Sequence, residues 1–185
     1  MIRTTDPHAT ATATTDGDRL FPPALADLAL LTFDPAEGEG VDFAPYGTFT
    51  SAEETTDWLR RWTGNDELTG DAYRVFGQDG NGGLAALWCA RPGRPLAEQP
   101  VVFLGSEGES GVVAGNLSDF LWILADGSGP KEAALDPERA PRPAPEPAGL
   151  AARHATTPRR PAREIAAGAR AEFPSFTDDL DELCR

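Results

Sequence analysis

The sequence predicts an α+β fold, with a small antiparallel sheet of about four strands and flanking helices. Short apolar runs separated by glycine-rich turns occupy residues 73–114, and this spacing is typical of strands joined by hairpins. Segments with helical periodicity precede and follow these runs instead of alternating with them. Helices grouped around consecutive strands favour an antiparallel sheet with helices packed on it.

Two helices are expected before the strands. The first lies around residues 22–31, where proline is tolerated in the first helical turn. The second begins at Ser51, which can form a capping box with Glu54, and ends at Gly64, which can serve as its C-terminal cap. Its apolar stripe consists of Thr55, Trp58, Leu59 and Trp62.

Four strands are expected at residues 73–76, 84–90, 101–104 and 112–114. The Asn81-Gly82 pair predicts a tight hairpin between the first two strands, because both residues tolerate a positive φ. The glycine-rich segment 105–111 joins the last two. The run at 101–104 is apolar throughout, as in a central strand.

A final helix is expected from Asn116, its N-terminal cap, to Gly127. Its main apolar stripe is Leu117, Phe120, Leu121, Leu124 and Ala125, and two further apolar residues widen the stripe almost to the whole circumference. A helix with this pattern is either deeply buried or partly covered by a partner. Trp122 lies off the main stripe and is a candidate partner-binding residue.

Composition divides the chain into four parts. Residues 1–19 are polar and predict a disordered N-terminal tail. Residues 20–130 form the folded domain, 131–161 are a proline-rich linker, and 162–185 are a C-terminal segment with one or two short helices. Prolines alternate with other residues over 140–147, which predicts an extended conformation there and mobility up to residue 158.

The charge balance excludes several classes of partner. The chain has 30 acidic and 16 basic residues, a net charge of −14. Nucleic acids and anionic membranes attract clusters of Lys and Arg, so neither is expected as a partner. No run approaches the roughly 20 apolar residues of a membrane-spanning helix, and no secretory signal is visible. We therefore expect a soluble, cytoplasmic protein.

The charge is unevenly distributed along the chain. Residues 1–127 carry 20 acidic and 7 basic side chains, a balance of −13. Residues 128–170 carry 5 acidic and 8 basic side chains, a balance of +3. This basic segment either lies across the acidic domain or is simply solvated, and the solvated state is the expectation here.

No catalytic residue is expected. A nucleophile needs a base within hydrogen-bond reach, and the two histidines, His8 and His154, fall in the tail and the linker. Cys89 is interpreted as a small core residue and Cys184 as an exposed thiol. The sequence around Ser106 lacks the spacing of a nucleophile elbow.

No cofactor and no metal is expected either. The glycine-rich loop at residues 77–83 lacks the Lys-Ser/Thr ending of a phosphate-binding loop. Asp79 and Asn81 suggest a calcium loop, but the position of the acidic twelfth ligand falls on Ala90. A hairpin turn is the simpler interpretation.

Four stretches of the chain resemble the SUKH superfamily, which includes the Smi/Knr cell wall assembly regulators of yeast and many bacterial immunity proteins. The resemblance covers about residues 20–130 and is densest over 72–130, in the runs that begin Tyr73-Arg-Val-Phe-Gly, Pro100-Val-Val-Phe-Leu, Gly111-Val-Val-Ala and Leu117-Ser-Asp-Phe-Leu. It implies an α+β fold and a non-enzymatic, protein-binding role. In bacteria it implies an immunity protein that neutralises a polymorphic toxin, often a nuclease.

The candidate binding residues are Asp79, Glu107, Glu109 and Trp122. The three carboxylates are expected at turn tips, where an acidic inhibitor would meet a basic toxin domain. Solvated turns without a partner are the alternative for Glu107 and Glu109. The alternative function is a regulatory or scaffolding protein of the same fold, with the proline-rich segment docking other proteins. The sequence does not specify the oligomeric state.

Overall fold

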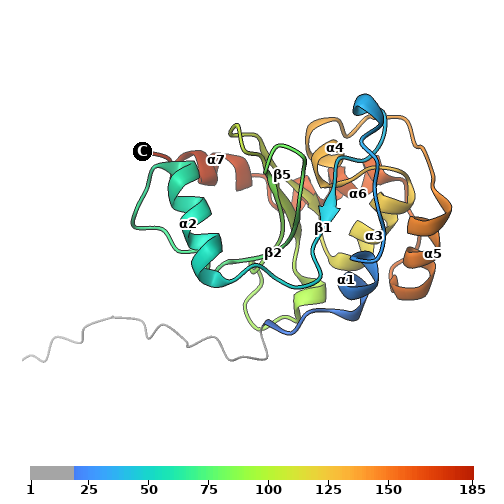
Figure 1. Cartoon of the computed structure of the whole chain (residues 1–185), viewed down its shortest axis with the longest axis horizontal. Coiled ribbons are helices and arrows are strands. Elements are labelled where there is room, and N and C mark those ends of the chain that lie inside the picture. The colour runs from blue at the N-terminus through green and yellow to red at the C-terminus, as the bar shows by residue number, and fades with distance from the viewer. Residues whose placement is uncertain (1–18) are drawn as a thin grey trace, which may run out of the picture.

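A computed structural model of the chain describes residues 19–185 (Figure 1). The predicted α+β fold is confirmed, with five strands in one antiparallel sheet whose order follows the chain. The strands are β1 (Ala44–Pro45), β2 (Tyr73–Gln78), β3 (Leu84–Trp88), β4 (Val101–Leu104) and β5 (Ser110–Ala114). The tail predicted over 1–19 lies outside the described residues except for Arg19.

Seven α-helices surround this sheet within the described residues: α1 (Pro23–Leu28), α2 (Ala52–Thr63), α3 (Leu117–Ala125), α4 (Pro130–Leu135), α5 (Pro145–His154), α6 (Ala162–Glu172) and α7 (Phe176–Asp181). The capping box of Ser51 and Glu54 is present at α2, and Gly64 ends that helix in the left-handed conformation. Asn116 caps α3 through Asp119, as predicted. Two 3-10 turns, η2 (Ala36–Gly38) and η3 (Leu96–Glu98), lie in the connections.

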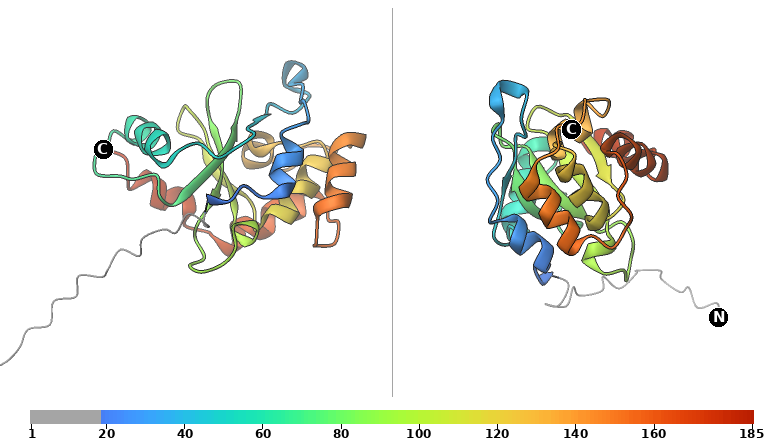
Figure 2. Two further views of the ribbon diagram at one scale, coloured as in Figure 1. Left: turned by 60° about the horizontal axis from the view of Figure 1, so that its bottom comes forward. Right: turned by 90° about the vertical axis from the view of Figure 1, so that its right-hand side faces the viewer.

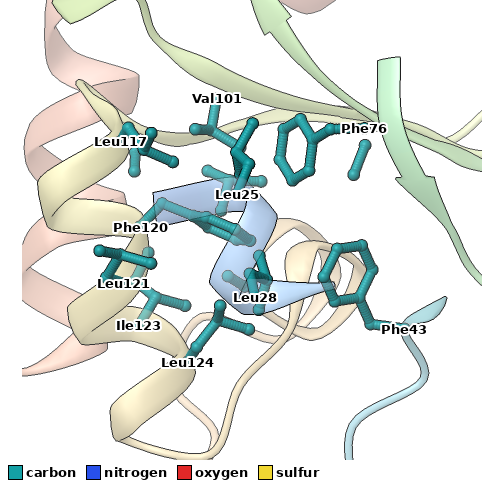
Figure 3. Packing of buried hydrophobic residues seen from close by; sticks show 14 of the residues in the cluster. Leu25, Leu28, Phe43, Phe76, Val101, Leu117, Phe120, Leu121, Ile123 and Leu124 are labelled. Atoms are coloured by element: carbon teal, nitrogen blue, oxygen red, sulfur yellow. The ribbon is translucent and has the colours of Figure 1, made fainter. Parts of the chain in front are cut away.

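The sheet is buried on both faces, which explains why its strands are continuous apolar runs and not alternating ones. Along β4, Val101 and Phe103 point into one core while Val102 and Leu104 point into the other. The first core holds α1, α3 and α5 against the sheet, and Figure 3 shows its centre around Phe120. The second core holds α2 and α7 against the opposite face.

Helix α6 lies along β5 and contributes to both cores, with Ile165 in the first and Ala169 in the second. It therefore covers an edge strand that would otherwise present unpaired backbone groups. The opposite edge is the two-residue strand β1, which is too short to predict from sequence. Gly77 of β2 permits this pairing, because a Cβ there would lie 2.4 Å from the Phe43 ring.

The prediction of a proline-rich linker over 131–161, extended over 140–147, is wrong at the level of secondary structure, because much of this segment is helical. Helices α4 and α5 form here, and Leu150 and Ala151 of α5 are completely buried. Prolines are compatible with both helices because they occupy first-turn positions, whose N–H groups have no partner within the helix. Figure 2 shows α5 lying against α3, so the apolar surface of α3 is covered by the chain itself.

The C-terminal segment 162–185, for which one or two short helices are predicted, contains the two helices α6 and α7. Gly127, expected as the end of the preceding helix, has a φ of +85°. A Cβ at this position would lie 2.1 Å from the carbonyl oxygen of Arg142. The glycine therefore both ends α3 and lets the segment before α5 pass close to the backbone.

Candidate protein-binding surface

The β4–β5 turn presents Glu107 and Glu109 to solvent, as the sequence predicts. The turn is closed by a hydrogen bond of 2.6 Å from the Gly105 N–H to the Glu109 carbonyl oxygen. Gly108 adopts a φ of +103°, which few other residues tolerate. Contact of these two glutamates with a partner stays a prediction.

Asp79 is not presented at a turn tip, so its expected role in binding a partner is wrong. Only 4% of the residue is exposed. Its carboxylate accepts hydrogen bonds from the N–H groups of Asn81 (2.9 Å) and Gly83 (2.7 Å) and lies 3.2 Å from the Lys131 ammonium. This Asp side chain shapes its own hairpin and ties α4 to it.

Lys131 carries the only ammonium side chain of the protein, and it is held by two carboxylates. Its nitrogen lies 3.0 Å from Asp42 Oδ2 as well as 3.2 Å from Asp79 Oδ2. The hydrogen bond to Asp42, followed by the one to Asp79, raises the pKa of the Lys131 ammonium. A basic residue of the supposed linker therefore neutralises two acidic groups of the domain.

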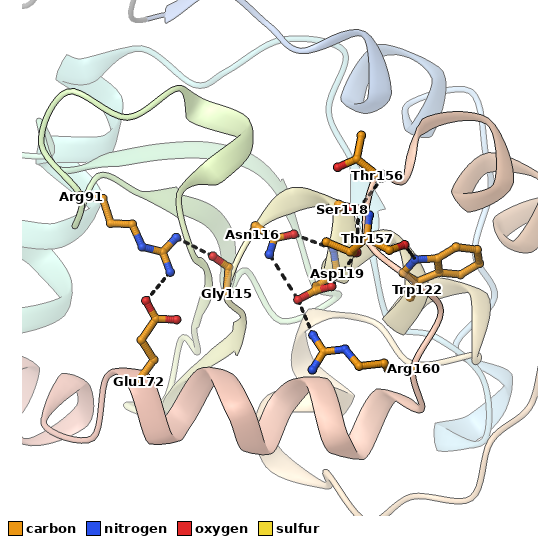
Figure 4. A network of polar contacts seen from close by, with 10 residues as sticks. All are labelled: Arg91, Gly115, Asn116, Ser118, Asp119, Trp122, Thr156, Thr157, Arg160 and Glu172. Carbon is orange, nitrogen blue, oxygen red and sulfur yellow. Dashed lines mark hydrogen bonds and ion pairs between the residues drawn. The ribbon is translucent and has the colours of Figure 1, made fainter.

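Trp122 is half-buried and is covered by the chain's own segment after α5, so it does not form an open partner site. Its indole N–H donates to the Thr157 carbonyl oxygen at 2.9 Å (Figure 4). The Arg159 guanidinium lies 6.0 Å from the centre of the ring, within the range of a cation–π contact. Trp122 was predicted to bind a partner, whereas Thr157 and Arg159 of the same chain cover it in the structure.

The segment that follows α5 is also held by two buried aspartates, Asp119 of α3 and Asp126, which directly follows that helix. Asp119 accepts hydrogen bonds from the Thr157 hydroxyl and the Arg160 guanidinium, both at 2.7 Å (Figure 4). Asp126 accepts from Arg159 at 3.0 Å and from the Ala162 N–H at 2.9 Å. The basic segment thus lies across the acidic domain, contrary to the expectation that it is simply solvated.

His154 is also held in place, which the sequence did not indicate. Its Nε2 lies 2.7 Å from the Asp27 carboxylate, beside a cavity of about 620 Å³ between α1, η3 and α3. The Ser118 hydroxyl in that cavity accepts hydrogen bonds from the N–H groups of Thr156 and Thr157. Ser118 therefore fixes the backbone after α5.

The two cysteines differ in their surroundings. Cys184 is exposed, as predicted. Cys89 lies just beyond the end of β3 and is half-buried, so it is not the core residue that the sequence suggested. Within residues 19–185, no cluster of three or more His, Cys, Asp and Glu side chains is arranged to hold a metal ion.

Uncompensated negative charge gathers at the end of the molecule formed by α2 and α7, and we call this surface the acidic end. It consists of residues 51–74, 105–110 and 173–185, which bear twelve acidic and four basic side chains, a balance of −8. All twelve acidic residues are exposed: Glu53, Glu54, Asp57, Asp66, Glu67, Asp71, Glu107, Glu109, Asp178, Asp179, Asp181 and Glu182.

The three segments of the acidic end are held together by specific contacts. The Arg185 N–H donates to the Thr63 carbonyl oxygen at 2.9 Å, and the Asn65 side chain donates to the Leu183 carbonyl oxygen at 3.0 Å. These bonds join the end of α7 to the end of α2 (Figure 1). Ser106, beside Glu107, shares a surface hollow with Trp58 and Trp62 of α2.

A scan of protein-family models finds no match to the chain, and searches of curated proteins and of solved structures find none either. Within the described part of the chain, no helix combines the length and the apolar character that crossing a membrane requires. The resemblance to the SUKH superfamily stays a prediction.

Proposed function

We propose that this protein is a non-enzymatic binding protein whose acidic end captures a basic protein partner. In this proposal it is a cytoplasmic immunity protein that neutralises a polymorphic toxin, such as a basic nuclease. The supporting observation is the cluster of twelve exposed acidic residues at one end, with only four basic side chains among them.

Charge complementarity supports the nuclease as a partner class. A nuclease is basic where it binds an anionic substrate, and a concentrated negative surface accelerates the encounter with such a protein. A carboxylate surface also competes directly for the cations that would bind phosphates. The resemblance of residues 20–130 to a superfamily rich in immunity proteins leads to the same function.

The alternative is a regulatory or scaffolding protein that docks others through its proline-rich segment. It has weaker support, because Pro130, Pro145 and Pro147 lie in helices α4 and α5. The exposed prolines Pro158 and Pro161 have the spacing of a docking motif, but the two arginines between them are paired with Asp126 and Asp119, which holds this segment against α3.

The test begins with a search beside this gene for a toxin gene with a variable C-terminal end, and the domain encoded there is the partner used. Its association rate is measured at low and high salt with the wild type and with the triple variant Asp57→Asn/Glu107→Gln/Glu109→Gln. Slower association with a flatter salt dependence is expected, because neutralisation removes part of the steering field. Inhibition of the toxin's activity by the wild type is the second readout.

The matched control is Glu138→Gln/Glu146→Gln/Glu164→Gln, which removes three exposed charges outside the acidic end. Its association rate should stay close to that of the wild type. Equal rates for the two triple variants would exclude the acidic end as the binding surface. A toxin that neither associates nor loses activity would contradict the immunity function itself.

A further inference from the structure

An aromatic groove lies within the acidic end, between α2 and the turns of the sheet. Trp58 and Trp62 stack on each other with ring centres 5.3 Å apart and planes inclined by 24°. Both are half-buried, whereas the neighbouring Leu59 on the same helix is 3% exposed and anchors α2 to the second core. The tryptophans therefore lie at the margin of the helix interface, where part of each ring faces solvent.

Trp58 forms a wall shared by two hollows. One hollow, of about 490 Å³, lies between α2 and the β2–β3 hairpin and includes Tyr46 and Gln78 on its opposite side. The other, of about 230 Å³, lies between α2 and the β4–β5 turn at Ser106. The Tyr46 hydroxyl donates to Gln78 Oε1 at 2.7 Å, which fixes the far wall of the first hollow.

The first hollow is lined by two carboxylates, Glu54 and Asp57. The second is bordered by Ser106 of the β4–β5 turn, whose exposed glutamates Glu107 and Glu109 follow it in the sequence. Hydrogen bonds from the Ser51 hydroxyl and N–H lower the pKa of the Glu54 carboxyl, so this group stays ionised. Arg61 lines both hollows and is the cation that opposes these carboxylates.

We propose that this aromatic groove receives an arginine side chain of the basic partner, with its guanidinium against Trp58 and Trp62 and its charge facing the surrounding carboxylates. This inference rests on the proposed function and names the side chain that the acidic end recognises. A planar guanidinium stacks on an indole ring and donates to carboxylates in the same plane.

The direct test needs no variant. The ¹⁵N-labelled full chain is titrated with a capped peptide of alternating arginine and glycine, and the indole N–H signals are followed by NMR. The Trp58 and Trp62 signals should shift, while the Trp122 signal should stay in place because Thr157 holds that indole at the other end. The matched probe replaces each arginine by citrulline, which keeps the shape and removes the charge, and it should shift neither signal.

Two substitutions should change the affinity for the arginine peptide in opposite directions. Trp58→Leu should weaken binding of the arginine peptide about five-fold, the effect of losing one cation–π contact. Arg61→Gln should tighten binding about two- to five-fold, because it removes the competing cation. Arg94→Gln is the matched control: Arg94 pairs with Glu98 away from the acidic end, and its loss should leave binding unchanged.

The groove proposal is overturned if the Trp58 and Trp62 signals stay unchanged at saturation, or if Arg61→Gln weakens binding. A lysine peptide that binds as tightly as the arginine peptide would overturn the assignment to a guanidinium. In each case association with the toxin and its salt dependence can persist, so the failure belongs to the groove alone. Loss of all association with the toxin would instead contradict the proposed function.

Discussion

The two ends of the molecule use acidic residues in opposite ways. At the end formed by α3, α4 and α5, four aspartates (Asp42, Asp79, Asp119 and Asp126) are contacted by cations of the segment 128–170. At the acidic end, twelve carboxylates are exposed, and Arg185 forms an ion pair with one of them, Glu67. We call the first of these regions the clamped end.

Because of this difference, the net negative charge is concentrated on one part of the surface. A value of −14 spread evenly over the surface would only favour solubility. Because the basic segment neutralises the clamped end, the remaining negative charge is concentrated at α2 and α7. A concentrated field steers a basic partner to one surface, whereas an even field does not.

The largest expected effect tests whether α5 belongs to the clamped end or is a detachable linker. Leu150→Ala should lower the free energy of unfolding by about 2–5 kcal/mol, because the side chain is completely buried against α3. The measurement is a chemical denaturation curve, with Phe103→Ala of the central strand as a reference at about 3–5 kcal/mol. A loss below about 1 kcal/mol for Leu150→Ala would mean that α5 contributes little to the fold.

The stability of the protein at alkaline pH should depend on a tyrosine of the second core, which lies beneath the acidic end. Burial raises the pKa of Tyr73 to about 12 from 10.0, so the folded state disfavours the phenolate. The stability that this group contributes is complete below pH 10 and is lost as the pH rises to about 12. The loss should be about 2–3 kcal/mol.

The test for this alkaline transition is Tyr73→Phe, which should flatten the fall in stability between pH 10 and pH 12. Tyr46→Phe is the matched control, because burial also raises the pKa of Tyr46 but this residue lies on the surface beside the groove. A profile equally steep in the wild type and in Tyr73→Phe would contradict the assignment.

At the clamped end, Asp119→Ala should cost about 1–2 kcal/mol, since the Thr157 hydroxyl loses an acceptor within a largely buried network. The cost stays moderate because Arg160, the other partner, is 44% exposed and can turn to water. The variant should also be cut faster by a protease at residues 156–160. Asp57→Ala at the acidic end, with an exposed carboxylate, should change stability by less than about 0.5 kcal/mol.

Sequence alone predicts the framework of this fold because its signals are local. Ser51, Glu54 and Gly64 define α2 through contacts within a few residues. The first hairpin forms at the predicted place, but its loop spans residues 79–83, only Gly82 of the Asn81-Gly82 pair has a positive φ, and the Asp79 carboxylate holds the loop. The strand β1 was missed because two residues carry no periodicity. The alternating prolines over 140–147 were interpreted as a linker, although Pro145 and Pro147 lie in the first turn of α5.

The binding residues were harder to predict because exposure depends on the whole fold. Glu107 and Glu109 are exposed, but Asp79 is buried by Lys131, which lies 52 positions away in the sequence. Trp122 is covered by Thr157, and no local pattern links these two residues. The sequence places Trp58 and Trp62 in the apolar stripe of their helix. Only the packing of α2 shows that these two residues lie at the margin of the stripe.

The smallest expected effect is the change in the free energy of unfolding when carboxylates are neutralised. This change should have opposite signs at the two ends. Asp181 and Glu182 close α7 at its C-terminus, where a negative charge opposes the helix dipole and faces other carboxylates of the acidic end. Asp181→Asn/Glu182→Gln should therefore raise the free energy of unfolding by a few tenths of a kcal/mol. The comparison variant Glu39→Gln removes a charge that pairs with Arg142 of the basic segment at the clamped end, and it should lower the free energy of unfolding by a similar amount. Both effects should shrink in 1 M salt, where charges are screened over about 3 Å. A change of the same sign for both variants would show that the two ends do not differ in their charge compensation.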